Sequence, residues 1–351
     1  MANSYKFSIF KNVHEAQVIE LLKSEWIYSP DIFNWKFKLN PYNSRVLGFV
    51  VLKDDKVVGF RGFIPLKFYF MGKIINVVSL TDGIISKDHR RKKLFTLLND
   101  YALDKLRLDG YFKFVYSLSS IKASTKAYQK GNWLSVGKKR TFFLNTWSSL
   151  LLGHFPYVSS LLNRAQKIDQ NFGDYKFYFT QKCLSGHMSN LASSIVSHNI
   201  TNVKSREYFN WRGKNPTKKY KFAYSFDSKN CLDCYIIFDC TSKKQWKLLD
   251  FKFKKKLIFT KLLNYVIKYK LKGLLSAYLY FGSTSSSSFY ESIGFSPINF
   301  IKKINSKFLL NRNEDLPFMI FLLEDRFDDD NKDNFLESRN WHLSLIDDDG
   351  A

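Results

Sequence analysis

The chain has 351 residues, of which 45% are hydrophobic and 17% aromatic, a composition that excludes an intrinsically disordered protein and allows two domains with separate cores. Its 55 basic and 31 acidic residues give a formal net charge of +24, which predicts anionic partners: nucleic acid, a membrane surface or phosphorylated small molecules. Charge alone does not distinguish these partners.

The sequence predicts neither a secretory signal nor a membrane-spanning helix. Its first residues contain no apolar core of a signal peptide, and the most apolar segment, residues 147–162, is short and contains His154 and Pro156. We expect that segment to form a buried helical hairpin, with binding to a membrane surface as the alternative. The four cysteines fit no disulfide framework and no complete zinc site. A cytoplasmic protein with reduced thiols and no metal is therefore predicted.

The first seventy residues predict a strand, a helix and then antiparallel hairpins. A strand is predicted at residues 5–10, a helix at residues 14–23 and a turn at residues 33–35. Hairpin strands follow between polar turns, at residues 46–52, 57–64 and 68–70.

The central stretch of the first half, residues 74–133, has the layout of a phosphate-binding unit. A strand at residues 74–86 leads through a polar turn into the basic residues 90–93, and a helix begins at Leu94 and ends at Gly110. Free N–H groups at a helix start carry partial positive charge, and the basic side chains add full charges, so this loop suits a pyrophosphate. A solvent-exposed basic helix start is the simpler alternative.

A second strand, at residues 112–119, is followed by a short helix that ends at Tyr128, Gly131 and Trp133. This pattern is typical of a helix that a glycine terminates before a new strand. Residues 135–144 are predicted to form that strand and to close the sheet. The whole order predicts a mixed α/β fold with a mostly antiparallel sheet and flanking helices.

These residues resemble the acyl-CoA-binding elements of the GNAT acyltransferase superfamily. The loop of that family, Gln/Arg-x-x-Gly-x-Gly/Ala between a strand and a helix, is matched at Arg90, whereas Lys93 and Phe95 replace its two small residues. The family's tyrosine before a helix-ending glycine is matched at Tyr128. The resemblance implies a GNAT-like fold, an acyl-CoA donor and direct attack by an amine.

The resemblance also implies a CoA site on the strand end, the basic loop and the helix start, with the following strand splayed to admit the pantetheine arm. The residues expected to bind the cofactor are Gly83, Ile84, Ile85, Ser86, Arg90, Arg91, Lys92, Lys93, Leu94, Phe95, Thr96, Ser117, Ser119, Ser124 and Tyr128.

The second half of the chain repeats the first. Four short phrases recur in the same order, which favours duplication over coincidence. They begin at Tyr5, Phe33, Phe95 and Tyr128 in the first half and at Tyr175, Phe209, Phe259 and Tyr290 in the second. The second basic turn, residues 252–256, has no arginine or glycine at the motif positions, and residues 68–75 have no clear counterpart. We expect one working site, in the first half, with two working sites as the alternative.

The repeat predicts two tandem GNAT-like domains. Residues 1–146 are expected to form the domain with the acyl-CoA site, and residues 147–171 a helical connector. A degenerate second domain at residues 172–335 shapes the acceptor pocket, and residues 336–351 form a C-terminal tail.

Nearly the whole chain is similar to double-GNAT nucleotide-sugar N-acyltransferases of bacterial surface-polysaccharide gene clusters, which build lipopolysaccharide O-antigen or capsule. The similarity rests on Phe33, Trp35, Asn40 and Pro41 and on a Trp-His-x-Ser phrase that begins at Trp341. It implies a dTDP-linked 3-amino-3,6-dideoxy sugar as acceptor. The implied donor is acetyl-CoA or a short 3-hydroxyacyl-CoA such as 3-hydroxybutyryl-CoA.

Three residues are candidates for the chemical step. Tyr128 matches the family's proton donor to the thiolate, with a core tyrosine as the alternative, while Asp82 and His342 are candidate bases or, more simply, orienting and structural residues. Backbone N–H groups of residues 82–85 are the expected oxyanion donors. Aromatic rings suit stacking on a base or sugar, although a core role is their default. The expected substrate-binding residues are Trp35, Tyr42, Arg61, Asp82, Trp341 and His342.

Two rival functions remain. A tRNA-dependent aminoacyl or peptidoglycan-bridge transferase also has twin GNAT-like domains, but it needs a long helical arm that residues 147–171 are too short and apolar to form. A non-catalytic nucleic-acid-binding module predicts a single basic face, whereas here the basic residues are spread along both halves. We expect no stable nucleic-acid partner and a monomer or weak oligomer. Missing motifs disfavour a serine hydrolase and a P-loop protein.

Overall fold

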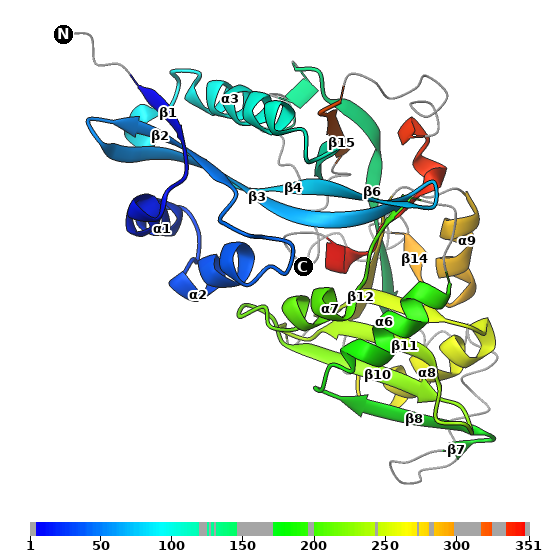
Figure 1. Ribbon diagram of the computed structural model, residues 1–351. Coiled ribbons are helices and arrows are strands. Elements are labelled where there is room, and N and C mark those ends of the chain that lie inside the picture. Colours follow the sequence, from blue (N-terminus) through cyan, green and yellow to red (C-terminus); the bar gives the residue numbers. More distant parts are fainter. Residues whose placement is uncertain are drawn as a thin grey trace.

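The structure is a computed structural model that describes residues 5–118, 125, 128–129, 131–145, 171–195, 200–242, 245–271, 274–280, 284–297, 317–324 and 335–347. These residues form two lobes that share one continuous, mostly antiparallel sheet, with helices against both lobes (Figure 1). Among them, no helix is long and apolar enough to cross a membrane.

The first half runs from β1 to β6. Its strands are β1 (Lys6–Ile9), β2 (Gly48–Lys53), β3 (Lys56–Phe70), β4 (Lys73–Ile85), β5 (Phe114–Ser117) and β6 (Leu134–Asn145). Its helices are α1 (Glu15–Lys23), α2 (Pro30–Phe33), η2 (Asn34–Lys38) and α3 (Leu94–Asp109), with short 3-10 turns η1 (Asn12–His14) and η3 (Lys87–His89). The predicted strands and the two long helices are confirmed within a few residues. Gly110 ends α3 with a φ of +65°, as predicted from its position.

The turn predicted at residues 33–35 is wrong, because these residues are helical. The Ser29 hydroxyl accepts a hydrogen bond from the Ile32 N–H, and Pro30 occupies the first helical position, so the start of α2 is capped and preorganised. The chain then continues as the π-helix η2 and turns Trp35 and Lys36 inward, where they are 2% and 8% exposed. Residues 33–35, which the sequence pattern predicts as a turn, therefore belong to a helical segment whose side chains face the core.

The second half repeats this element order. Its strands are β7 (Asn171–Phe172), β8 (Tyr175–Thr180), β9 (Ile200–Asn202), β10 (Tyr220–Phe226), β11 (Leu232–Asp239), β12 (Gln245–Phe253), β13 (Leu274–Tyr280) and β14 (Ser296–Pro297). Its helices are α6 (Ser185–Ser194), α7 (Arg206–Arg212), α8 (Lys256–Tyr269) and α9 (Thr284–Ser292). The last elements are β15 (Pro317–Leu322), η5 (Ser338–Asn340), β16 (Trp341–His342) and η6 (Leu345–Asp347). The β11–β12 hairpin is shorter than the β3–β4 hairpin, which agrees with the predicted absence of a counterpart to residues 68–75.

The two halves exchange strands at their junction. The order along the sheet is β1-β2-β3-β4-β5-β15-β6-β13-β12-β11-β10-β8-β7. β15, from late in the chain, lies antiparallel to β5 and to the start of β6, whereas the later part of β6 lies antiparallel to β13. The strand predicted to close the first sheet is therefore an interior strand. Its sequence pattern identifies a strand but contains no information about its neighbours.

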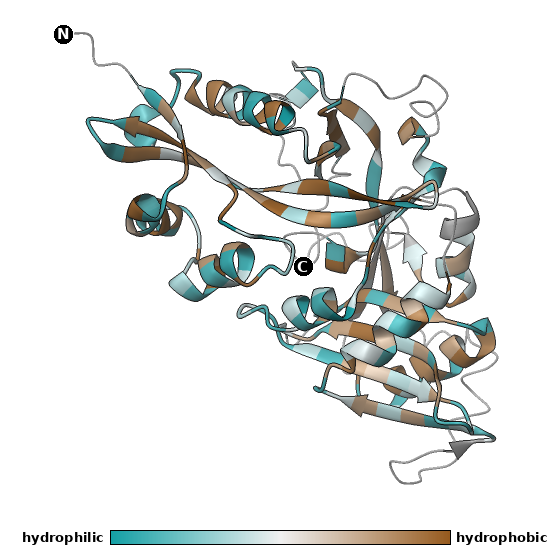
Figure 2. Cartoon of the chain, viewed as in Figure 1, coloured by the Kyte–Doolittle hydropathy of each residue, from teal (hydrophilic) through white to brown (hydrophobic). Residues whose placement is uncertain are grey.

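Hydrophobic residues concentrate on the strands and along the helices that pack against them (Figure 2). Separate clusters lie under α3 and α8, and the largest cluster spans both halves. There the rings of Trp35 and Trp211 stack, with centroids 5.5 Å apart, and each indole N–H donates to the other residue's carbonyl oxygen, at 2.9 and 2.7 Å. The two copies of the Phe-Asn-Trp phrase thus contact each other in the hydrophobic core shared by the two halves.

Candidate functional site

β4 is distorted in the middle of the first sheet. It pairs parallel with β5 at only two positions, the last being Ser79 with Tyr116, and the strands separate beyond that point. Its register against β3 shifts between Phe60 and Gly62, and on the opposite strand Asp82 has a φ of +44°. A bulge beside a parallel pairing that ends releases backbone groups from the ladder. The end of this pairing is the place where the resemblance predicts that the two strands splay apart.

The Asp82 carboxylate has two partners. One oxygen lies 2.7 Å from the Lys36 ammonium, and the other accepts a hydrogen bond from the Tyr28 hydroxyl at 2.7 Å. Lys36 also donates to the Thr81 hydroxyl at 3.0 Å, and the Lys36 and Asp82 side chains are only 10% and 8% exposed. A carboxylate that is already paired with a largely buried ammonium suits orientation of a bound group better than proton abstraction.

Arg61 connects the bulge to the helices that pack on it. It is 4% exposed, its Nε donates to Asn99 Oδ1 at 2.8 Å, and its Nη2 donates to the Tyr128 hydroxyl oxygen at 3.3 Å. The guanidinium lies over the Phe95 ring, 4.8 Å from its centroid. Gly83 makes this position possible, because a Cβ there would lie 2.2 Å from the Arg61 Cζ. Arg61 therefore joins β3, β4, α3 and Tyr128 into one site.

Tyr128 faces this buried cation. Its ring is 4% exposed and stacks on Trp133, with centroids 4.5 Å apart. Because its oxygen accepts from Arg61, its hydroxyl proton is directed to another acceptor. Among the residues that the structure describes, no carboxylate forms an ion pair with Arg61. A buried guanidinium without an acidic partner stabilises negative charge next to it, which suits a phenol that protonates a departing thiolate.

The basic loop before α3 has the backbone shape that glycines usually provide, although it contains none. Arg91 and Lys93 have φ values of +63° and +59°. Lys93 is the N-cap of the 16-residue helix α3 and makes no side-chain cap to its first N–H groups. Arg90 instead fixes the loop: its Nε donates to the Ile85 carbonyl at 3.0 Å, and its Nη2 lies 2.7 Å from Glu25. That hydrogen bond lowers the pKa of Glu25.

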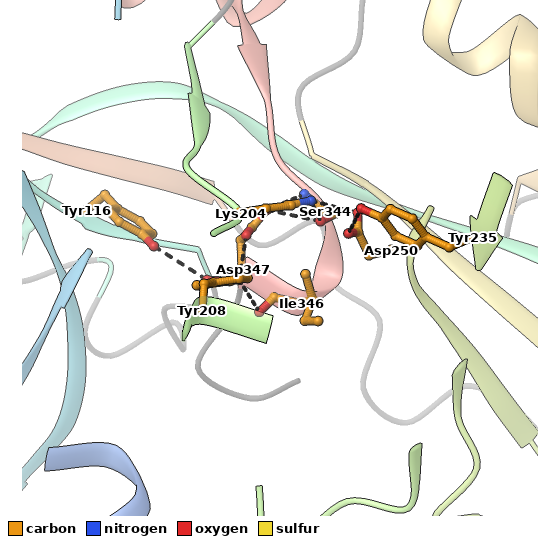
Figure 3. A network of polar contacts seen from close by, with 8 residues as sticks. All are labelled: Tyr116, Lys204, Tyr208, Tyr235, Asp250, Ser344, Ile346 and Asp347. Atoms are coloured by element: carbon orange, nitrogen blue, oxygen red, sulfur yellow. Dashed lines mark hydrogen bonds and ion pairs between the residues drawn. The ribbon is translucent and has the colours of Figure 1, made fainter. Parts of the chain in front are cut away.

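Asp250 occupies the corresponding point of the second half. β12 pairs parallel with β13 only as far as Leu248 with Ala277, and its register against β11 shifts immediately afterwards. The Lys204 ammonium lies 2.7 Å from one Asp250 oxygen, and the Tyr235 hydroxyl donates to the other at 2.9 Å (Figure 3). An aspartate between a lysine and a tyrosine therefore recurs at the bulge of both halves.

The C-terminal tail occupies the second gap. η6 contacts both β12 and β13, and its two apolar residues are buried. Asp347 accepts hydrogen bonds from the Tyr208 hydroxyl and from the Ser344 N–H, both at 2.8 Å, and Lys204 donates to the Ser344 hydroxyl at 2.8 Å (Figure 3). The Tyr116 hydroxyl on β5 reaches the Asp347 carbonyl at 3.4 Å. The tail thus fills the second gap and ties it to the first half.

The pKa values in this network favour ion pairing over proton transfer. Burial by itself would lower the pKa of Lys204, but Asp250 and Asp347 raise it above its usual value. Burial and Asp347 raise the pKa of Tyr208, and burial and Asp250 raise the pKa of Tyr235. The lysine therefore stays charged and both phenols stay neutral around neutral pH, so the network holds the tail in place.

The structure brings several predicted site residues together around the first bulge: Arg61, Asp82, Gly83, Phe95 and Tyr128. Others form the loop and helix start, namely Ser86, Arg90, Arg91, Lys92, Lys93, Leu94 and Thr96, of which Leu94 is buried in the core under α3. Ile84 and Ile85 are buried in two different clusters, and Ser117 ends β5 with 8% exposure. Ser119 and Ser124 lie outside the described residues.

Four other predicted residues lie elsewhere. Trp35 and Trp341 are core residues, and the Trp341 indole, 3% exposed, donates to a backbone carbonyl at 2.8 Å. The Tyr42 hydroxyl bonds to the second half, at a backbone carbonyl and a serine, and burial raises its pKa. His342 lies on β16, where its charged neighbours are two lysines and Asp250. These side chains therefore do not line the first bulge.

The sequence analysis missed three residues of the site: Tyr28, Lys36 and Asn99. For Lys36 a signal existed, because the repeated Phe-Asn-Trp phrase is followed by a basic residue in both halves, and its counterpart Arg212 is 1% exposed. Asn99 lies one helical turn after Phe95 on α3. Tyr28 reaches Asp82 across 54 residues, a contact that no local pattern indicates.

The cysteines and potential metal ligands form no site among the described residues. All four cysteines are free, and no cluster of three or more His, Cys, Asp or Glu side chains occurs there. Burial raises the pKa of Cys183 to about 11 and of Cys240 to about 12, so these thiols are protonated at neutral pH.

No protein-family model and no curated protein sequence matches this chain. Solved structures match it by fold, over 92% of its length. A GCN5-related N-acetyltransferase from Anabaena variabilis gives a TM-score of 0.63 at 11% identity over 73% of that chain. A tandem GNAT protein from the clavulanic acid biosynthesis pathway gives 0.56 at 12% over 100%, and Saccharomyces cerevisiae N-myristoyltransferase with bound myristoyl-CoA gives 0.52 at 13% over 83%. The predicted fold class, mixed α/β with tandem GNAT-like units, is confirmed.

Proposed function

We propose that the protein is an acyl-CoA-dependent N-acyltransferase with its working site in the first half. The observation that carries the proposal is the combination of three neighbouring features. These are the bulge in β4, the end of the pairing between β4 and β5, and the start of α3, which has no side-chain cap. Among proteins of this fold, the yeast N-myristoyltransferase binds myristoyl-CoA. The shared fold supports acyl transfer as the class of reaction, and the residues at the first bulge offer the groups that such a reaction needs.

The basic loop is the proposed site for the CoA phosphates. The first N–H groups of α3 point out of the helix end, and the exposed side chains of Arg91, Lys92 and Lys93 add positive charge around them. The left-handed backbone at Arg91 and Lys93 turns successive N–H groups toward one side, as anion-binding loops do. Arg90 acts indirectly, since it fixes the loop to Ile85 and Glu25.

In the proposed reaction the neutral acceptor amine attacks the thioester carbonyl, the C–S bond breaks and CoA leaves as a thiolate. The nitrogen releases one proton to solvent as the amide forms, and the phenol that protonates the sulfur regains its proton from solvent. Asp82 and Gly83 have no ladder partner on β3, so their N–H groups suit the developing oxyanion. Tyr128 gives its proton or a hydrogen bond to the departing sulfur, and Arg61 stabilises the charge left on the phenol oxygen. Asp82, held by Lys36, orients the acceptor amine.

The proposed acceptor is a nucleotide-linked amino sugar, of the dTDP-3-amino-3,6-dideoxyhexose type, that is acylated in the cytoplasm from acetyl-CoA or a 3-hydroxyacyl-CoA. Two features support this class. The phrases that begin at Phe33 and Trp341 resemble those of such enzymes, and the net charge of +24 favours a substrate with a diphosphate. The Asp82–Tyr28 pair also offers hydrogen bonds of the kind that sugar amines and hydroxyls use.

The test is calorimetric titration with CoA, using a loop variant and a matched control. Arg91→Ala/Lys93→Ala is expected to weaken binding at least about tenfold, because charge-assisted contacts to phosphate are each worth about 1.5–3 kcal/mol. Lys254→Ala/Lys255→Ala removes two exposed lysines from the corresponding loop of the second half and is expected to leave binding unchanged. Equal losses in both variants, or no binding by the unaltered protein, would overturn the proposal. A panel of dTDP-amino sugars with acetyl-CoA then identifies the acceptor.

A further inference from the structure

A second polar site lies in the other half of the molecule, where β9, β12 and the end of α6 meet the tip of the long β3 strand. A small cavity of about 20 Å³ opens there, a volume that holds about one water or one oxygen of a small anion. Its polar lining consists of Tyr69, Ser193, Thr201, Asn202, Lys204 and Lys252.

Asn202 is the residue that points to a ligand. It is 3% exposed, yet neither its amide nitrogen nor its carbonyl oxygen has a hydrogen-bond partner. Leaving such a group unpaired in a protein interior costs about 1–3 kcal/mol. Its backbone is fixed, because β9 pairs with β16 on one side and with β3 on the other. The orphaned amide is therefore held at the cavity wall and is available to a bound group.

The charged side chains that line the cavity are cationic, and the carboxylates of Asp250 and Asp347 lie behind Lys204. Two lysines line it, and none of its described lining residues is acidic. The nearby Asp250 and Asp347 direct their oxygens to Lys204, Tyr235, Tyr208 and the Ser344 N–H, which uses their acceptor capacity. Lys252 forms no ion pair within the described part of the chain. Burial, followed by the charge of Lys204, lowers the pKa of Lys252, and the charge of Asp250 opposes this only in part.

We infer that this cavity binds the carboxylate or phosphate group of a small ligand, with Lys252 and the Asn202 amide as its principal contacts. Lys252 supplies the charge, the Asn202 N–H group donates to one oxygen, and Thr201 adds a hydroxyl. Lys204, which is already paired with Asp250, fixes the wall of the site. The inference does not depend on acyl transfer. The proposed acyl-transfer site lies in the first half, whereas Asn202 and Lys252 belong to the second half, where the tail fills the gap between β12 and β13.

His342 provides a local reporter for this site. It pairs with Thr201 across β16 and β9, and Lys252 and Lys204 are among its charged neighbours. We would label histidine with ¹³C and ¹⁵N and titrate the intact protein separately with sodium acetate and inorganic phosphate at constant ionic strength. The His342→Gln variant assigns the signal among the six histidines.

One or both anions are expected to shift the His342 signal saturably, and the comparison of acetate with phosphate shows which group the cavity prefers. Asn202→Asp, nearly isosteric but negatively charged, and Lys252→Met are each expected to weaken the response at least tenfold. Lys254→Met, an exposed lysine two residues further along, is the matched control and is expected to keep it. A linear shift, or one equal in all variants, would show that the cavity holds only water and would overturn the inference. CoA binding, measured in the same samples, tests the first half separately.

Discussion

The two halves place the same chemical group at the same point of the fold and use it differently. In each, an aspartate at the bulge lies between an ammonium and a phenol, at Asp82 in the first half and Asp250 in the second. Asp82 is followed by Gly83, and the space that the missing Cβ leaves is taken by Arg61. Asp250 is followed by Phe251, whose ring packs against Phe259 of α8.

This difference shows that the same arrangement of charged groups can also stabilise the packing of a chain segment. In the second half the C-terminal tail fills the gap between the separating strands, and its Asp347 adds a second carboxylate beside Lys204. An ion pair of the same kind, which we propose orients a substrate in the first half, anchors a segment of the protein in the second. Buried charges hold a position well when every partner is present, and they are costly when one is removed.

The largest expected effect is the loss of the second-half ammonium. Lys204→Met leaves Asp250 and Asp347, 3% and 0% exposed, without their cation. This is expected to lower the free energy of unfolding by about 3–5 kcal/mol, measured by urea denaturation. Lys36→Met, whose partner Asp82 is 8% exposed, is the matched change in the first half and is expected to cost less stability and more activity. Equal losses of stability would contradict the division of roles.

A second comparison uses the repeated tyrosines. Tyr128→Phe removes the proposed proton donor and is expected to lower kcat for acyl transfer about 100-fold, the usual scale for a general acid. Tyr290 is its counterpart in the second half; burial raises its pKa, and its ring stacks on Phe142. Tyr290→Phe is therefore expected to leave kcat within twofold of the unaltered enzyme. Similar losses in both variants would show that Tyr128 acts through packing.

A third substitution removes the space that the Arg61 side chain occupies. Gly83→Ala places a Cβ 2.2 Å from the Arg61 Cζ, so the guanidinium must move away from Tyr128. We expect a loss of about 1–3 kcal/mol in stability, measured by thermal and urea unfolding, together with lower activity. Gly186→Ala on α6 is the control, since a Cβ there meets no atom within 4 Å, and its effect is expected to stay within about 0.5 kcal/mol. A stable, fully active Gly83→Ala variant would exclude a role for this arginine.

The smallest effect is expected in the pH dependence of stability. Burial, then Lys252 and Lys204, lower the pKa of His342 from 6.5 to about 4. The folded state thus favours the neutral ring, and as the pH falls below 6.5 the unfolded chain takes up the proton first, so stability is lost between about pH 6.5 and 4. His342→Gln is expected to flatten this slope in urea unfolding at several pH values. The effect is modest because neighbouring side chains crowd the ring while part of its surface still contacts solvent, which screens the charges around it. An unchanged slope would assign the acid sensitivity to other groups.

Local patterns predicted most of the elements correctly. The periodicity of α3, its stop at Gly110 and the β3–β4 hairpin all follow from spacings of a few residues. Two local predictions failed for physical reasons. The helix at residues 30–38 is too short to show a helical hydrophobic period and is set by its serine cap and its proline, and the role of β6 depends on partners from late in the chain. Trp341 shows a related limit. From the sequence, an aromatic ring near the chain end can equally be predicted to stack on a ligand or to pack in the core, and in the structure it is a core residue.

The sequence by itself determined the GNAT-like fold, the repeated phrases and part of the first-half site, namely Arg61, Asp82, Gly83, Phe95 and Tyr128, whereas Tyr28, Lys36 and Asn99 were found only in the structure. Only the tertiary structure decided that Arg61 and Tyr128 touch across 67 residues, and that Lys204 and Ser344 touch across 140. Contacts at such separations depend on how strands from both halves are exchanged, and the spacing of residues along the chain contains no record of that exchange. For the same reason, the filling of the second gap by the tail became evident only once the fold was known.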